Sequence, residues 1–368
     1  MRILIGADLV PTENNFDLFT EGNIEALIGK KLMAEFENAD LKVFNLELAL
    51  ADKDTPIKKA GPNLRAPTST VNGIKEMANV IGVSNNHVLD HGYEGFVSTL
   101  KTLDDAGIAH VGAGHTKEEA KKPYYFEKDG IKVGVYACCE HEFSWVEDYG
   151  FGSNGFDALE SLDDIEEAKK NCDYLIVLYH GGKEHYAYPS PYLAKVCRKI
   201  IKSGADIVLC QHTHCVGTEE DYMGGKIIFG QGNFIFAKNL ANAKTWGPGF
   251  LVAIDLDKSG AKYQYIPYVR TENGIEYEEE GEILKGLKER SEEIKQPGFI
   301  QEKFEELVSD ASEFYVRFMQ GRIPEEKDFE RITTFHFAEC EVHREGLLCA
   351  LRQRMGLGKF GEFKDLKK

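Results

Sequence analysis

Apolar residues follow two alternating patterns from residue 2 to residue 112 of the chain. Short apolar runs of strand type are separated by stretches in which apolar residues recur at helical spacing, as at Ile24, Leu27 and Leu32. We expect strands at 2–6, 41–45, 80–83 and 108–112, and helices at 23–38, 68–77 and 96–106. This order of strands and helices predicts an α/β layered fold.

A second group of strands follows this first set. The segments 123–128 and 132–138 flank Asp129-Gly130, which is a strong hairpin turn signal. Further strands are expected at 173–179, 207–209, 226–229, 250–256 and 262–269, with helices at 159–170 and 191–202. Residues 144–157, rich in glycine and aromatic residues, are expected to form a loop or lid. A second, partly antiparallel sheet is therefore predicted.

The character of the chain changes after residue 275. An acidic run leads into helical periodicity that breaks at Pro297-Gly298, and a last helix is predicted from about 326 to 356. We divide the chain into an α/β domain, 1–275, and a helical C-terminal extension, 276–368. The extension either packs on the α/β domain or provides an interface for an oligomer. His336 and His343 are expected on its surface or at that interface.

Composition narrows the classes of function. The 368 residues are 42% hydrophobic and carry a net charge of −17, which argues against binding nucleic acid or an anionic membrane. The eight cysteines form no CxxC pair and fit reduced core thiols, although Cys210 and Cys215 flank two histidines. Asp8 interrupts the N-terminal apolar run, and no later run reaches the ~18 apolar residues of a membrane span. We therefore expect a cytoplasmic protein without a membrane span.

Polar residues of compatible chemistry follow many of the predicted strands. The carboxyl ends of parallel strands meet at one edge of a sheet, so these side chains are expected to converge. Carboxylates, imidazoles and an amide suit one or two divalent ions such as Mn, Fe or Zn. Two such ions ~3.5–4 Å apart can clamp a phosphoryl group. The set comprises Asp8, Glu47, Asn86, His87, Asp90, His180, Glu184, His212 and His214.

Each of these residues also has an ordinary structural explanation. Asp8 alone could cap a turn, and Asn86 could form an Asx turn. The recurrence of such residues at several strand ends favours a joint metal site. His87, beside Asn86, is a candidate catalytic residue, acting as general acid or oxyanion stabiliser with Asp90 orienting its ring. The segment Glu140-His141-Glu142 could also line the site.

Several short motifs follow one another along the chain: Gly6-Ala7-Asp8, Asn45-Leu46-Glu47, Asn85-Asn86-His87 with Asp90, Gly92 and Gly95, His180-x-Gly182-x-Glu184, Gly204-Ala205-Asp206, His212-x-His214 and Gly232-Asn233-Phe234. In this order they resemble the CapA family of poly-γ-glutamate capsule biosynthesis proteins, which is similar to the calcineurin-like metallophosphoesterases. The resemblance covers roughly residues 1–270. It implies a four-layer metallophosphoesterase-like fold, a β-sandwich flanked by helices, with the metal site at one sheet edge.

The resemblance also implies roles for individual residues. Glu47 would bridge two ions, and His87 would lie beside the scissile group. Glu184 and Asn233 are assigned to substrate binding. The implied metal ligands are Asp8, Glu47, Asn86, His180, His212 and His214.

One departure from the phosphoesterase pattern stands in the first motif. Typical phosphoesterases have a histidine two residues after the aspartate, where this chain has Val10. His214 would then be the only histidine at the first metal, while His180 and His212 serve the second.

Two functions remain open on these grounds. The chain is either a metal-dependent hydrolase of the phosphoesterase type, acting on an anionic small molecule or polymer, or a non-hydrolytic metal-binding component of a capsule or polyglutamate assembly.

Overall fold

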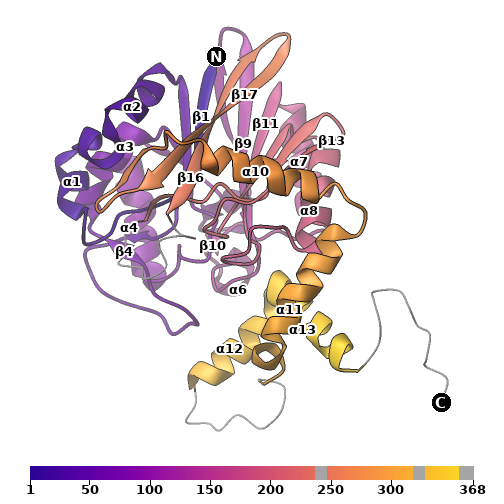
Figure 1. Ribbon diagram of the computed structural model, residues 1–368. Helices are drawn as coiled ribbons and strands as arrows, with labels where there is room; N and C mark the ends of the chain where they lie inside the picture. Colours follow the sequence, from indigo (N-terminus) through magenta and orange to yellow (C-terminus); the bar gives the residue numbers. More distant parts are fainter. Residues whose placement is uncertain (237–246, 318–327, 356–368) are drawn as a thin grey trace.

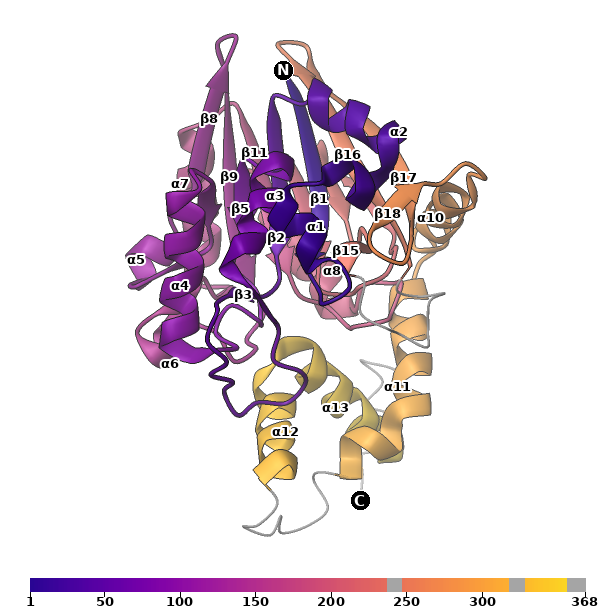
Figure 2. The ribbon, with the colours of Figure 1, turned by 90° about the vertical axis from the view of Figure 1, so that its left-hand side faces the viewer.

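Two β-sheets stacked face to face and covered by helices on both outer sides form the main body of the protein (Figures 1 and 2). This computed structural model describes residues 1–236, 247–317 and 328–355. The order of layers is helix, sheet, sheet, helix, with further helices at the C-terminal end. The predicted four-layer α/β fold is thus confirmed.

The first sheet has eight strands in the order β18-β17-β16-β1-β2-β5-β6, with β15 paired to β1. β1 runs parallel to β2 and β15 and antiparallel to β16. The alternating N-terminal strands and helices therefore build the parallel half of this sheet. The strand bounds are β1 Arg2–Val10, β2 Leu41–Leu46, β5 Val80–Gly82, β6 Ala109–Val111, β15 Asn233–Phe236, β16 Pro248–Asp257, β17 Gly260–Arg270 and β18 Ile275–Tyr277.

The second sheet has six strands in the order β13-β14-β12-β11-β9-β8. β8 and β9 form the predicted hairpin, in which Asp129 and Gly130 have positive φ values of 55° and 71°, as a tight two-residue turn requires. The strand bounds are β8 Tyr124–Lys128, β9 Ile131–Cys139, β11 Tyr174–His180, β12 Ile207–Gln211, β13 Glu219–Tyr222 and β14 Gly225–Ile228.

Both faces of the sheets are buried, and β1 shows how the sequence achieves this. Ile3 and Ile5 point into the core between the two sheets, whereas Leu4 points to the helices outside. Helices α1–α4 cover the first sheet, and α7 and α8 cover the second. Their bounds are α1 Phe16–Glu21, α2 Ile24–Asn38, α3 Val71–Met77, α4 Gly92–Asp105, α7 Ser161–Lys170 and α8 Pro191–Lys202.

Short elements complete the main body. Half of the residues in the predicted loop 144–157 are buried, and the segment contains a helical turn and a short strand, so it is not a free lid. The short elements are β3 Ala49–Leu50, β4 Arg65–Ala66, η1 Thr68–Thr70, β7 Ala113–Gly114, α5 Lys117–Ala120, α6 Val146–Tyr149 and β10 Gly152–Ser153.

The C-terminal helices have a core of their own beyond one edge of the sheets (Figure 2). They are α11 Phe299–Arg317, α12 Asp328–Glu339 and α13 Glu341–Arg354. In contrast, β18 and α10, Glu282–Glu293, belong to the main body, because β18 pairs with β17 and Leu287 packs in the core between the sheets. The division at residue 275 stays a prediction, and the separate helical core begins at α11.

The last helix differs from the prediction. The segment forms two helices, α12 and α13. They are separated at Cys340, where the backbone is extended with a ψ of 131°. Both predicted ends, 326 and 356, lie outside the described residues. His336 was expected at the surface or at an interface; the surface alternative is wrong, because only 6% of this residue is exposed and it contacts Glu142 of the α/β part. Helical periodicity alone could not reveal a corner that turns these side chains toward the α/β part.

Candidate metal centre

Asp8 lies at an irregular point in the middle of the first sheet. The pairing of β1 with β2 shifts register between Ile5 and Asp8, and that with β15 shifts just after Asp8. Such bulges re-aim side chains and are common beside active sites. Asp8 is buried and pairs across the sheet with Asn45 and Asn233. Its Oδ1 accepts a hydrogen bond from Asn45 Nδ2 at 2.8 Å, and Oδ2 accepts one from the His212 backbone N–H at 3.1 Å.

Glu47, directly after β2, faces two different histidines. Its Oε1 lies 3.3 Å from His180 Nε2, and its Oε2 lies 3.9 Å from His214 Nδ1. Neither oxygen accepts a hydrogen bond from the described residues, although the side chain is fully buried. Burial, together with the nearby Asp8 carboxylate, raises the pKa of Glu47 well above its usual value. A buried carboxylate without hydrogen-bond donors is costly unless a cation binds to it.

His180 ends β11, in the second sheet, and points across to the first. Its Nε2 lies 3.0 Å from Asn86 Oδ1, and its Nδ1 lies 3.3 Å from Asn45 Nδ2. Burial lowers the pKa of His180 to about 4, so the imidazole is neutral at pH 7. A neutral imidazole is the form that binds metals.

His212 and His214 follow β12 in an unusual backbone conformation. Their φ values of 82° and 56° lie in the left-handed region, which residues with a Cβ seldom adopt. Strain of this kind is often found at functional sites. The turn brings the two rings to 5.9 Å between centroids, and His214 Nδ1 lies 2.8 Å from Asn233 Oδ1. Burial lowers the pKa of His212 to about 4, whereas Glu47 and Asp8 raise that of His214 despite burial.

Two groups of potential ligands result, each with its donor atoms within 4.8 Å of one another. One group is Asp8, Glu47 and His214; the other is Glu47, His180 and His212. Glu47 belongs to both, and Asn86 adds an amide oxygen beside His180. This mixture of carboxylate, imidazole and amide donors fits Mn, Fe or Zn. A pair of cations there would also compensate the unpartnered Glu47 oxygens.

His87 and Asp90 form a pair beside this centre. His87 Nδ1 lies 2.5 Å from Asp90 Oδ2, the arrangement expected for an orienting carboxylate. Burial lowers the pKa of His87, against the raising effect of Asp90, so the ring is neutral at pH 7. Asp90 Oδ1 also meets Lys59 Nζ at 2.5 Å, with both side chains buried. Lys59 was not among the predicted site residues, because a lysine in a polar loop gives no sign of burial in the sequence.

Three further residues were predicted near the site, and they differ in position. Asn233 touches His214, whereas Glu184 belongs to neither ligand group and its side chain is 44% exposed. Glu142, in the loop after β9, lies with Oε2 3.6 Å from His212 Nε2 and therefore lines the centre as expected.

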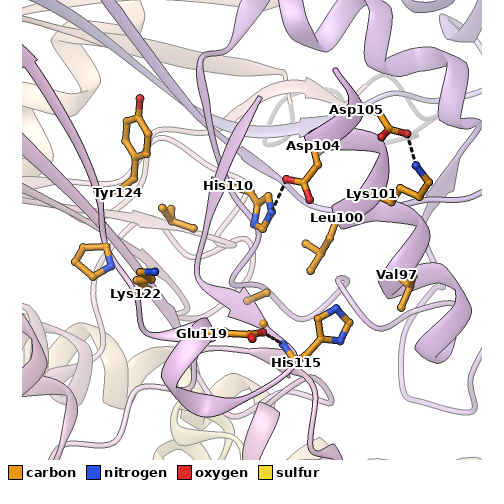
Figure 3. Close-up of a pocket in the computed structure, with 14 residues that line it drawn as sticks. Val97, Leu100, Lys101, Asp104, Asp105, His110, His115, Glu119, Lys122 and Tyr124 are labelled. Carbon is orange, nitrogen blue, oxygen red and sulfur yellow. Dashed lines mark hydrogen bonds and ion pairs between the residues drawn. The ribbon is translucent and has the colours of Figure 1, made fainter. Parts of the chain in front are cut away.

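Surface hollows of the described residues lie outside the ligand groups, and two of them bear on the site. One, of about 620 Å³, lies between α4 and the strands β6 and β8; its side chains include His110, His115 and Glu119 (Figure 3). It shares no residue with the ligand groups. The other, of about 530 Å³, is bordered by Val10 and Phe236. Because the Phe236 ring lies 5.8 Å from the His214 ring, the second hollow adjoins the candidate metal centre.

The stacked sheets, with strand ends that gather these side chains, define a layered α/β sandwich protein with a candidate metal centre. The sequence profile of the family "Bacterial capsule synthesis protein PGA_cap" matches residues 17–238, more than half of the chain. The chain therefore belongs to this family, as the motifs had suggested.

Two curated relatives carry names that agree with the family. Capsule biosynthesis protein CapA of Bacillus anthracis is 30% identical over 219 residues, which cover 56% of this chain and 53% of that protein. PGA biosynthesis protein CapA of Bacillus subtilis (strain 168) is 28% identical over 207 residues, 54% of this chain and 52% of that one. The chain thus spans about half the length of these relatives.

More distant similarity extends to solved structures. A protein described as a candidate 5'-nucleotidase from Staphylococcus aureus, in complex with alpha-ketoglutarate, has a TM-score of 0.47 and 14% identity, covering 78% of this chain and 58% of that one. A likeness at this level assigns neither function nor ligand. Among the described residues, no helix combines the length and apolar character needed to cross a membrane.

Proposed function

We propose that the chain is a metal-dependent hydrolase of the phosphoesterase type, acting on an anionic substrate in capsule or poly-γ-glutamate biosynthesis. The observation that carries the proposal is Glu47, a buried carboxylate shared by two groups of potential ligands. A carboxylate between two sets of imidazole donors is the arrangement expected of a two-metal site. The names of the two capsule biosynthesis relatives support the biological context.

The residues divide into those that hold ions and those that act on substrate. Asp8, Glu47 and His214 would hold one ion, and Glu47, His180, His212 and Asn86 the other. Ions of Mn, Fe or Zn at these positions would polarise a phosphoryl oxygen and activate water. No cysteine belongs to either group, so the donor set alone does not favour a soft metal.

His87 would act at the scissile group. Asp90 holds its Nδ1, which fixes the direction of the ring. With Nδ1–H donating to Asp90, the neutral ring offers Nε2 as an acceptor, and Nε2 would have to take up a proton before it could act as a general acid. Lys59 holds the second oxygen of Asp90 and so fixes the carboxylate.

Substrate recognition is proposed at the rim. The hollow beside Val10 and Phe236 adjoins His214, and Asn233 and Glu184 flank the same histidine loop. The net charge of −17 repels an anion at long range, so binding would depend on the ions. A cytoplasmic location remains a prediction from the sequence.

The test is metal content together with hydrolysis of bis-p-nitrophenyl phosphate. Protein reconstituted with Mn, Fe or Zn should turn over this diester, and His87→Ala should lower kcat by ~10²- to 10⁴-fold with metal content unchanged. His115→Ala, at an exposed histidine of the other hollow, is the matched control and should behave as wild type. Failure of the reconstituted protein to bind any metal would overturn the proposal.

One observation favours the alternative, a non-hydrolytic metal-binding component of a capsule or polyglutamate assembly. Val10 occupies the position of the motif histidine, so the first ligand group has a single imidazole. Bound metal with no turnover of the diester or of γ-glutamyl substrates would support this alternative.

A further inference from the structure

A second buried cluster of metal-ligating side chains lies where the C-terminal helices meet the α/β part. Glu142, His336, Cys340 and His343 each offer one donor atom, and these atoms all lie within 4.8 Å of one another. None of the four belongs to the two ligand groups around Glu47.

The corner between α12 and α13 creates this cluster. His336 lies in the last turn of α12, Cys340 is the residue between the helices, and His343 lies in the first turn of α13. The Cys340 backbone N–H donates to His336 O at 2.9 Å and closes the last turn. The two histidine rings come to 4.8 Å between centroids. Glu142 approaches from the loop after β9, with Oε1 3.1 Å from His336 Nε2.

Hydrogen bonds account for only part of this cluster: His336 Nε2 faces Glu142 Oε1, but other nitrogens have no partner. His336 Nδ1 and His343 Nδ1 are buried and have no hydrogen-bond partner among the described residues. Only 6% of His336 and 1% of Cys340 is exposed. A buried polar atom without a partner is costly, and a bound cation would give these two histidines a role.

We propose that these four residues form a zinc-type site, separate from the Glu47 centre. One thiolate, two imidazoles and one carboxylate make up the four donors of a tetrahedral zinc site. The charges also balance, because the thiolate and the carboxylate together neutralise a divalent cation in a buried place. A sulfur donor favours zinc over manganese or magnesium.

Another grouping of Cys340 is less suitable. Its sulfur also lies near oxygens of Glu140 and Glu341, but that set offers two carboxylates and no imidazole. The set with two histidines provides four donors and includes both residues whose Nδ1 atoms have no partner among the described residues.

A zinc ion there would connect two parts of the molecule. It would fix the α12–α13 corner on the loop that carries Glu142. The other oxygen of Glu142, Oε2, lies 3.6 Å from His212 Nε2, so the ion would also hold a neighbour of the Glu47 centre in place.

Cobalt substitution of the full chain tests the site. Thiolate ligation gives tetrahedral Co²⁺ an intense charge-transfer band in the near ultraviolet, and the Glu47 groups contain no sulfur to produce one. The band should be present in wild type and in Cys349→Ser, a matched control at another buried cysteine of α13, and absent in Cys340→Ser. Zinc content of Cys340→Ser should fall by about one equivalent per chain.

Two results would overturn the proposal. One is a Co²⁺-loaded wild-type protein without a thiolate band; the other is a band that Cys340→Ser leaves unchanged. The wild-type measurement does not depend on any variant folding. Because the readout is not hydrolysis, its outcome is independent of the proposed phosphoesterase activity.

Discussion

At the scale of single residues, Asp90 is buried and its carboxylate contacts three groups. It accepts from His87 Nδ1 and the Leu64 N–H and pairs with Lys59 Nζ, each at 2.5 Å. We predict that Asp90→Ala lowers the free energy of unfolding by about 3–5 kcal/mol, because it leaves the Lys59 ammonium buried without its counter-charge. Urea denaturation measures the change.

The control for this prediction is the double variant Asp90→Ala with Lys59→Met. Removing both charges should recover a substantial part of the lost stability, since an apolar pair of similar size needs no counter-charge. A loss below about 1 kcal/mol in Asp90→Ala alone would contradict the buried pairing.

Acid sensitivity of the metal-free protein follows from two neutral histidines. His180 and His212 have pKa values of about 4 because of burial, against 6.5 in an unfolded chain. Between these values the unfolded state binds more protons than the native state, so stability falls as the pH falls below 6.5. From pH 7 to pH 5, His180→Gln should lose about 2 kcal/mol less than wild type, as measured by urea denaturation. An unchanged pH dependence in this variant would contradict the neutral state of His180, and His115→Gln serves as the control.

The residues that could be predicted are those whose position follows from topology. His180, His212 and Glu47 come at strand ends, and parallel strands gather such residues at one edge. Lys59 could not be found in this way, because it reaches Asp90 from an irregular loop. Asn45 was noted only as part of a motif, yet it holds Asp8 and His180 together.

At the scale of elements, α8 agrees with its predicted range, 191–202, because both of its ends carry chemical signals. Pro191 occupies the first turn, and the Ser190 side chain accepts a hydrogen bond from the Leu193 N–H at 3.1 Å. We predict that Ser190→Ala costs about 1 kcal/mol of stability, measured by thermal or urea unfolding. Ser203→Ala, at the other end, where the backbone alone caps the helix, should stay within about 0.5 kcal/mol. Equal losses at both serines would argue against the cap.

The elements that could not be predicted depend on tertiary contacts. The corner at Cys340 carries no proline or glycine, so nothing local in the sequence ends α12 there. The corner instead accompanies the contact of His336 with Glu142, a residue distant in sequence. For the same reason, residues 144–157 were predicted as a loop although Ser153 is buried and pairs with β7.

At the scale of the whole molecule, carboxylates of α13 fasten the C-terminal helices to the α/β part. Glu345 accepts a hydrogen bond from the Tyr192 N–H at 3.0 Å, at the N-terminus of α8, and Glu341 accepts one from the His141 N–H at 2.8 Å. A carboxylate at a helix N-terminus is favourable because the free N–H groups point toward it. The sequence left open whether the extension packs on the α/β part or forms an interface between chains; in this structure it packs, while an oligomer stays a prediction.

The sequence positions of the residues that form the hydrophobic cores lead to a prediction about truncation of the chain. Leu287 is the last buried residue in the core between the sheets, and Ile294 is the last buried residue in the outer core of the second sheet, against which Phe299 and Ile300 also pack. A chain ending at residue 296 therefore keeps every buried residue of these two cores and should fold with a single cooperative unfolding transition. It would expose Glu142, a carboxylate that water can solvate. We expect this shortened chain to retain metal at the Glu47 centre and to lose the thiolate–cobalt band, as measured by circular dichroism, metal analysis and absorption. A shortened chain that is soluble only when α11–α13 are supplied in trans would instead make the helices part of the folding unit.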